Sequence, residues 1–277
     1  MTMTSSTATL PDGTRLACRE LGEGRPVLLH PGFALTRELW APLMAELAED
    51  HRCIAFDPRG HGASDSPAGR WTIERLAEDL AELADVLDLR DATLVGHSLG
   101  GAVACTAVLD FDAAARFSRL VLLGPAVPGF VQRPGQPFGA PRPVFDRLLG
   151  EMTDDFVGTS RRTAEIFFHQ ADPEAGRAVM EAGLRMRPEV AAELFAQLGE
   201  IDLADRLDEI PMPVLALWGR HDTLSDPRWA GWFEDLELPG WRTGILEHSA
   251  HGSMLDEPEE LASRIRAFEG LESTPWT

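Results

Sequence analysis

Residues 96–101, Gly-His-Ser-Leu-Gly-Gly, contain the pattern G-x-S-x-G centred on Ser98. They follow a run typical of a buried strand, residues 92–95. A strand that turns sharply into a helix here leaves one serine hydroxyl clear of the sheet edge, in a strained backbone conformation. A side chain two residues before or after the serine would collide with the turn, which explains Gly96 and Gly100. The pattern predicts a nucleophilic serine, although a glycine-rich turn can also be an ordinary strand–helix connection.

A serine nucleophile needs a general base and an acid that orients the base. Asp222 follows a predicted strand at 214–218, and catalytic groups in parallel sheets gather at the carboxyl ends of the strands. His251 lies in the loop after the next predicted strand. We expect His251 to be the base and Asp222 the acid. His248 and Asp226 are the alternatives for these two roles.

Acyl transfer by a serine also needs two backbone N–H groups that stabilise the oxyanion. The N–H of Leu99, directly after the serine, is one expected donor. The other is expected in the loop 30–33, His-Pro-Gly-Phe, unless that loop is a simple strand-end turn. Pro31 has no N–H, and Gly32 lets the backbone approach a substrate. The N–H of Phe33 is therefore the predicted second donor.

The amino-acid composition excludes some classes of binding partner and some kinds of catalytic group. The chain has 277 residues, a formal net charge of −20 and a hydrophobic fraction of 44%, as in an ordinary globular enzyme. Nucleic acids and anionic membranes are also negative and would repel it. All 25 basic residues are arginine, and lysine, tyrosine and asparagine are absent. Lysine bases, Schiff bases and tyrosine oxyanion donors are therefore excluded.

No targeting or membrane segment is predicted. Residues 1–10 are polar and lack the basic and apolar regions of a signal peptide. No apolar run approaches the roughly 18 residues of a membrane span, so a cytoplasmic location is expected. Cys18, Cys53 and Cys105 are widely spaced in strand-like or helix-like runs, so we expect buried free thiols rather than disulfides or a metal site.

Strand-like and helix-like segments alternate through the first half of the chain, which predicts a mostly parallel sheet with helices on both faces. The predicted strands are 14–19 (an edge strand), 26–30, 52–56, 92–97, 120–123, 213–218 and 242–246, and the predicted helices are 37–49, 72–88, 99–109 and 258–268. Residues 125–142 are rich in proline and glycine, and 143–209 read as several helices without a strand. We expect a core of residues 1–125 and 211–277, with a helical cap, 126–210, inserted between two strands.

Four separated motifs follow one another in a recognisable order: residues 30–33, residues 57–64 (Asp-Pro-Arg-Gly-His-Gly-Ala-Ser), residues 96–101, and residues 219–222 together with 251–258. On these motifs the chain resembles the α/β-hydrolase superfamily from about residue 8 to residue 268. It is most similar to the small serine ester hydrolases that include the cofactor-free haloperoxidases, also called perhydrolases. Their Asp-Arg-Arg-Gly-His-Gly loop is matched at 57–62, with Pro58 in place of one arginine, their Ala-Val-Pro at 126–128, and their His-Gly at 251–252.

The resemblance implies an α/β-hydrolase fold, with an eight-stranded, mostly parallel sheet, a helical cap, and a Ser98–His251–Asp222 triad. Two residues depart from the family pattern. Pro31 occupies a position where the family usually has histidine, and Ala34 occupies one where perhydrolases often have proline. The second departure weakens the perhydrolase interpretation and leaves the triad untouched.

The favoured function is hydrolysis of a small or medium carboxylic ester or lactone through an acyl-enzyme, without a metal or organic cofactor. One alternative is peroxide as the acyl acceptor, which would give haloperoxidase activity. Another is a non-hydrolytic acyl transfer or cyclisation in biosynthesis. The expected partner is a small ester-like molecule, and the sequence leaves the oligomeric state open.

Several further residues have weaker expectations. Gly32, Phe167, Phe168 and Met180 are candidate substrate-pocket residues, although apolar residues at helical spacing more often simply pack. Arg59 and His61 are expected to brace the loop at 57–64, and His97 to face away from the nucleophile and pack. The acidic run 256–260 is expected to begin a helix rather than to bind a metal.

Overall fold

The computed structural model describes residues 2–69 and 71–270. Eight strands form one sheet in the order β1-β2-β4-β3-β5-β6-β7-β8. The strands are β1 (Thr4–Thr9), β2 (Arg15–Leu21), β3 (Arg25–His30), β4 (His51–Phe56), β5 (Ala92–His97), β6 (Phe117–Leu123), β7 (Val214–Gly219) and β8 (Trp241–Leu246). β2 pairs antiparallel with β1 and with β4, and all other pairs are parallel. The eight-stranded, mostly parallel sheet expected from the sequence is confirmed.

The edge of the sheet differs from the prediction. The segment 14–19 was expected at the edge, but it forms most of β2, which lies between β1 and β4. The edge strand is β1, and its side chains are exposed except for Ala8. A strand that buries almost nothing shows no alternation of apolar and polar residues, so its Thr/Ser-rich sequence gave no strand signal beyond β-propensity.

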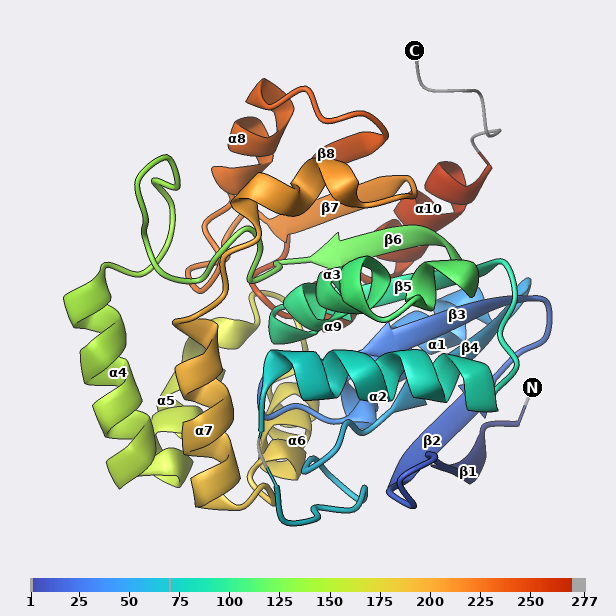
Figure 1. Cartoon of the computed structure of the whole chain (residues 1–277), viewed down its shortest axis with the longest axis horizontal. Coiled ribbons are helices and arrows are strands. Elements are labelled where there is room, and N and C mark those ends of the chain that lie inside the picture. The colour runs from blue at the N-terminus through green and yellow to red at the C-terminus, as the bar shows by residue number, and fades with distance from the viewer. Residues whose placement is uncertain (1, 70, 271–277) are drawn as a thin grey trace.

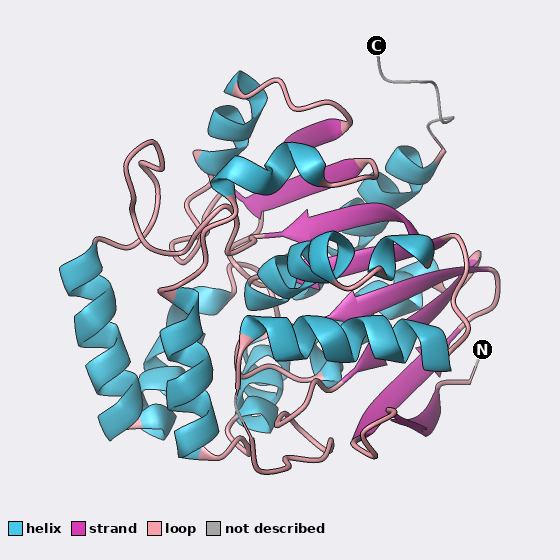
Figure 2. Ribbon diagram, viewed as in Figure 1, coloured by secondary structure: helices cyan, strands magenta, loops and turns pink. Residues whose placement is uncertain are grey.

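Helices cover both faces of the sheet (Figures 1 and 2). The α-helices are α1 (Ala41–Leu47), α2 (Ile73–Val86), α3 (Leu99–Asp110), α4 (Arg142–Asp154), α5 (Phe156–Phe167), α6 (Pro173–Gly183), α7 (Pro188–Leu198), α8 (Trp229–Asp235), α9 (Ser253–Asp256) and α10 (Pro258–Glu269). Short 3-10 turns lie at Arg37–Trp40, Ala113–Ala115 and Ala204–Glu209.

Alternation along the central strands divides the core into two layers. In β3, Leu28 packs in the layer with α2, α3 and α8, whereas Val27 and Leu29 pack in the layer with α1 and α10. In β5, Leu94 and Val95 divide in the same way. Strands that are apolar on both sides are typical of a parallel sheet that helices cover on both faces. The site must therefore lie at the ends of the strands rather than on a face.

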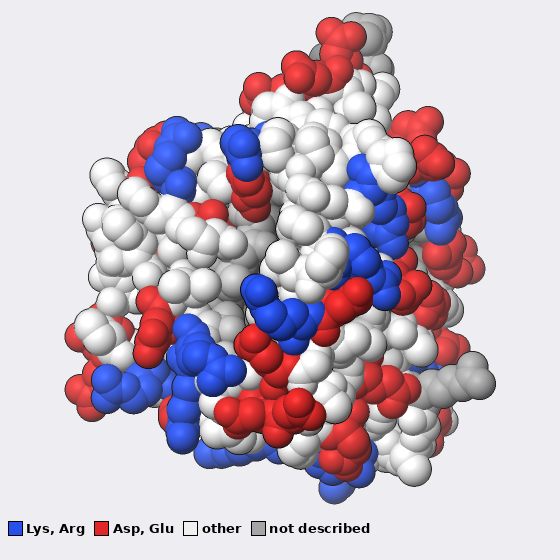
Figure 3. Space-filling model, turned by 90° about the vertical axis from the view of Figure 1, so that its left-hand side faces the viewer, with Lys and Arg blue, Asp and Glu red and all other residues white. Residues whose placement is uncertain are grey.

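The segment between β6 and β7 contains α4–α7, in agreement with the predicted block of helices at 143–209. In Figure 1 these helices lie beyond the ends toward which the arrows of β5 and β6 point. Figure 3 looks onto this side of the molecule, which is hollowed near its centre. In parallel sheets, functional sites form at the carboxyl ends of the strands, and α4–α7 lie next to these ends.

A cluster of charged side chains, Arg59, Asp79 and Asp12, braces the loop 57–64. The Arg59 guanidinium is buried and donates to both oxygens of Asp79 at 2.6 Å and to Asp12 at 2.7 Å. His61 Nδ1 lies 3.0 Å from the carbonyl oxygen of Arg59, and burial lowers the pKa of His61 to about 4. Both residues brace this loop, as expected from the sequence.

The three cysteines are free and buried, as expected. Burial raises the pKa of Cys18 to about 11 and those of Cys53 and Cys105 to about 12. They are therefore unreactive thiols of the core. Within the described residues, no helix is both long enough and apolar enough to cross a membrane.

Candidate active site

The candidate nucleophile lies at the junction of β5 and α3. Ser98 separates the two elements and has φ 53° and ψ −119°, a region that side-chain-bearing residues rarely adopt. A Cβ on Gly96 would lie 2.6 Å from the carbonyl oxygen of Gly100, and one on Gly100 would lie 2.5 Å from that of Pro31. Gly96 is thus required because of the turn itself, as expected from the sequence, whereas Gly100 is required because the loop after β3 packs against it. The strained conformation thus falls on the residue that would carry the chemistry.

The structure brings Asp222 and His251 together. Asp222 follows β7, and its Oδ2 lies 2.7 Å from Nδ1 of His251, with both side chains buried. The other carboxylate oxygen, Oδ1, accepts the backbone N–H groups of Leu224 at 2.8 Å and Ser225 at 2.9 Å. These two N–H groups fix the carboxylate, so its second oxygen is held toward the imidazole.

The alternative residues occupy other surroundings. Asp226 is held by Arg228, whose side chain donates to it at 2.6 Å. The backbone N–H of His248 donates to Glu257, and neither His248 nor Asp226 lines the cavity that contains Ser98. No three His, Cys, Asp or Glu side chains within 2–69 and 71–270 are grouped so that they could hold a metal ion.

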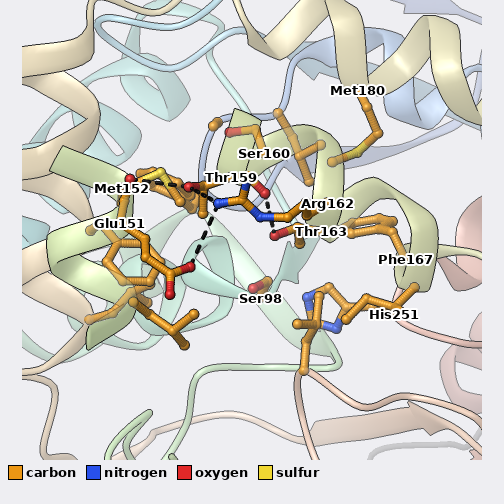
Figure 4. Close-up of a pocket in the computed structure, with 18 of the residues that line it drawn as sticks. Ser98, Glu151, Met152, Thr159, Ser160, Arg162, Thr163, Phe167, Met180 and His251 are labelled. Atoms are coloured by element: carbon orange, nitrogen blue, oxygen red, sulfur yellow. Dashed lines mark hydrogen bonds and ion pairs between the residues drawn. The ribbon is translucent and has the colours of Figure 1, made fainter. Parts of the chain in front are cut away.

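Ser98 and His251 line one cavity of about 340 Å³, called here the inner cavity (Figure 4). Its wall is mainly apolar, and most of it comes from α4–α7 and the loop after β3. Of the predicted pocket residues, Phe167 and Met180 line it, whereas Gly32 and Phe168 do not. Other lining residues include Phe33, Phe130, Leu148, Met152, Ser160, Leu184 and Phe195. A mainly apolar cavity of this kind is typical of a small-molecule site.

Two charged side chains lie in the inner cavity and face each other. Arg162 on α5 donates to the hydroxyl of Thr159 at 2.8 Å and lies 3.6 Å from a carboxylate oxygen of Glu151 on α4. Figure 4 shows this pair across the cavity from His251. The two opposite charges are paired with each other, so neither charge is isolated in this mainly apolar wall.

The loop after β3 lies directly against the nucleophile. A Cβ on Gly32 would be 2.9 Å from Cβ of Ser98 and 2.9 Å from Nδ1 of His97, so only glycine permits this approach. The N–H groups of Phe33 and Leu99, the two predicted oxyanion donors, have no acceptor among residues 2–69 and 71–270. Two unpaired backbone donors near a serine can hold a developing negative charge.

His97 is buried and packs against Trp40 and Phe167, as expected, but its ring also contacts the candidate base. Its Nε2 lies 3.0 Å from the carbonyl oxygen of His251, and the two ring centroids are 4.6 Å apart. A carbonyl can only accept, so Nε2 carries the proton. Burial holds the pKa of His97 well below its usual value, with the neighbouring His251 acting in the same direction. His97 is therefore a neutral donor that fixes the backbone of the candidate base.

Asp256 is a structural link that the sequence analysis missed. Its carboxylate accepts the backbone N–H groups of His169, Gln170 and Ala171, and that of Ala250 beside the candidate base. The acidic run had been interpreted only as a helix start, which fits Glu259 and Glu260 in the first turn of α10. The N–H groups of His169, Gln170 and Ala171 lie more than 80 residues before Asp256, and no spacing in the sequence reveals such a contact.

Comparison with known proteins agrees with this architecture. The family described as the alpha/beta hydrolase fold matches residues 25–258. The chain belongs to this α/β hydrolase family.

Several relatives are similar over nearly the whole chain. A non-heme chloroperoxidase of Streptomyces lividans is 29% identical, covering 95% of this chain and 98% of the relative. A pimeloyl-[acyl-carrier protein] methyl ester esterase of Nitrosomonas europaea is 28% identical, covering 89% and 96%. The solved structure of an esterase from Exiguobacterium antarcticum has a TM-score of 0.88 at 28% identity, covering 96% of this chain and 99% of that one.

Proposed function

We propose that this protein is a serine hydrolase that cleaves a carboxylic ester or lactone through an acyl-enzyme. Ser98 is the nucleophile, His251 the general base and Asp222 the orienting acid. One observation carries the proposal: the buried Asp222–His251 pair lies at the same cavity as a serine held in a strained turn. The similarity to two esterases supports the reaction class.

In the first half of the proposed reaction, Nε2 of His251 takes the Ser98 proton while Oγ attacks the carbonyl carbon. The carbonyl electrons move to oxygen, where the N–H groups of Phe33 and Leu99 stabilise them. Asp222 stabilises the imidazolium. The carbon–oxygen bond of the ester then breaks, and His251 gives its proton to the leaving alkoxide.

In the second half, a water molecule gives a proton to His251 and its oxygen attacks the acyl carbon. Collapse of that intermediate returns the proton to Ser98 and releases the carboxylic acid. All the groups used belong to the chain, the ester or water. We propose further that residues 126–210 act as a cap, because α4–α7 supply most of the wall around the acyl site.

The test is turnover of p-nitrophenyl esters from acetate to decanoate by the wild type and by Ser98→Ala. Activity should fall by at least about 10³-fold in the variant, since the oxyanion donors and binding alone leave little catalysis. Circular dichroism of both proteins provides the control for folding. Activity that survives in a folded Ser98→Ala variant would show that another residue is the nucleophile.

A second candidate function is attack of hydrogen peroxide on the acyl-enzyme, which yields a peracid that oxidises halide. The similarity to a chloroperoxidase over 95% of the chain favours it. Against it stands Ala34, where perhydrolases often have proline. Ala34 has φ 51°, and a proline ring fixes φ near −65°, so this loop cannot hold proline in its present form. A halide-oxidation assay in acetate with peroxide separates the two functions.

A further inference from the structure

A second cavity lies on the outer side of α5 and α6. This outer cavity has a volume of about 670 Å³. Three residues, Ser160 on α5, Met180 on α6 and Leu184 just after α6, line both it and the inner cavity. These three side chains, called here the shared wall, separate the chamber that contains Ser98 from a second chamber on the other side of the two helices.

The shared wall is built from small or adaptable side chains. Ser160 is small and buried. Met180 is unbranched and turns about three single bonds, so it can leave its place at little cost. Met180 is partly buried against the core layer that contains α1 and α10, and Leu184 is partly buried against the layer that contains α2 and α3. The shared wall therefore lies where the two layers meet. Figure 4 shows Met180 reaching from its helix toward the inner cavity.

Apolar and charged side chains both line the outer cavity. Its apolar lining includes Phe168 and Pro173, and Phe168 packs so closely that a Cβ on Gly176 would lie 2.8 Å from its ring. Its charged lining includes Arg161 and Glu181, which pair at 3.2 Å, together with Glu165, Asp172 and Arg177. In such a chamber the methylene groups of a chain can lie against Phe168 while the end of the chain meets water.

We propose that the shared wall is a gate through which the unbranched alkyl chain of an ester passes from the inner to the outer cavity. The proposal rests on the proposed ester hydrolysis and defines its substrate class as long-chain esters. Ligand sites span about 300–1,000 Å³, so the inner cavity, at about 340 Å³, lies at the small end of that range. A chain too long for it can continue into the second chamber past Met180 and Leu184, which line both cavities.

The first experiment compares kcat/KM for p-nitrophenyl dodecanoate and butanoate, and for dodecyl and butyl acetate, so that chains on the acyl and alcohol sides are tested separately. Each methylene moved from water onto apolar surface gives about fourfold in kcat/KM. The dodecyl-to-butyl ratio is kcat/KM for the longer chain divided by kcat/KM for the shorter one. Met180→Ala should raise this ratio at least about fourfold, either for the acyl chain or for the alcohol chain. Met180→Trp should lower it by about 15-fold, the value for two methylenes left in water.

Leu148→Ala is the matched control, because Leu148 lines the inner cavity but not the outer one. The Leu148→Ala substitution adds a similar volume to the inner cavity and leaves the shared wall unchanged. The dodecyl-to-butyl ratio should therefore change less in Leu148→Ala than in Met180→Ala. Equal changes in the two variants would mean that only volume matters and would overturn the gate.

The second experiment blocks the outer cavity without altering the wall. Ala164 lines only the outer cavity, and the native cysteines are buried, so in Ala164→Cys a bulky maleimide reacts at one place. Modification should lower the dodecyl-to-butyl ratio severalfold relative to the same variant before reaction, and the wild type treated alike is the control. An unchanged ratio overturns the proposal. If the untreated wild type does not hydrolyse butyl esters at all, the proposed function itself is refuted.

Discussion

Replacement of Asp222 by asparagine should stop the enzyme by imposing the wrong tautomer on His251. The backbone N–H groups of Leu224 and Ser225 both donate to Oδ1 of Asp222, at 2.8 and 2.9 Å. An asparagine must therefore place its carbonyl oxygen at that position, because its NH₂ group cannot accept. The NH₂ group then points at Nδ1 of His251, which lies 2.7 Å from the present Oδ2.

A donor facing Nδ1 requires that nitrogen to be unprotonated, and the proton of the neutral ring moves to Nε2. A protonated Nε2 cannot accept the proton of Ser98. In a serine protease triad the same kind of substitution lowers kcat about 10⁴-fold, or about 5 kcal/mol in the barrier. We expect a similar loss in Asp222→Asn, with little change in KM, since no substrate contact is removed.

The assay is p-nitrophenyl butyrate hydrolysis at neutral pH, with thermal unfolding followed in parallel. Asp226→Asn is the matched control, because Asp226 lies four residues later and is held by Arg228. That control should keep activity within a factor of about two. Retention of more than a tenth of wild-type kcat by a folded Asp222→Asn variant would refute the tautomer argument and the role of Asp222 with it.

Two further predictions concern stability. Ser98→Gly should be about 1 kcal/mol more stable than Ser98→Ala in urea unfolding, because glycine releases the strain at φ 53° and the gain exceeds its entropic disadvantage; the opposite order would show that the turn is unstrained. The hydrogen bond that His51 donates to Glu269 raises the pKa of His51 despite its burial, so His51⁺ stabilises the fold fully below pH 6.5 and loses this effect as pH rises through the raised pKa. The wild type should therefore exceed His51→Gln by about 2 kcal/mol at pH 6 and by less at pH 9.

The sequence predicted most of the elements that bury apolar residues, but it missed α8, which buries Trp229, Ala230 and Phe233, and β1, which buries almost nothing. Residues 26–30 and 92–97 fill both layers of the core, and their runs are apolar along nearly their whole length. β1 buries only Ala8, so nothing in its composition distinguished it from a loop. Burial leaves a pattern in the sequence, whereas a strand held by backbone pairing at an edge leaves almost none.

The same contrast applies to the candidate site. Ser98 could be located because glycines must flank it, and Asp222 and His251 because they follow predicted strands. The contact of His97 with His251 could not be predicted, since it depends on a loop 154 residues away that crosses the end of β5. The division of Phe167 and Phe168 between two cavities also depends on helix packing that spacing does not encode.

The links around His251 restrict how the helices over the site can move. The N–H of Gly252 donates to the carbonyl of Phe167 at 2.8 Å, and Asp256 holds both Ala250 and the residues after α5. The C-terminal end of α5 is thus fixed to the loop that carries the candidate base. A displacement of this end would move His251 away from Asp222, and the proposed catalytic pair at 2.7 Å would not tolerate that. The size of the inner cavity is therefore not expected to change by movement of this end of α5, and Met180, which takes part in none of these backbone links, can provide such a change by turning its side chain.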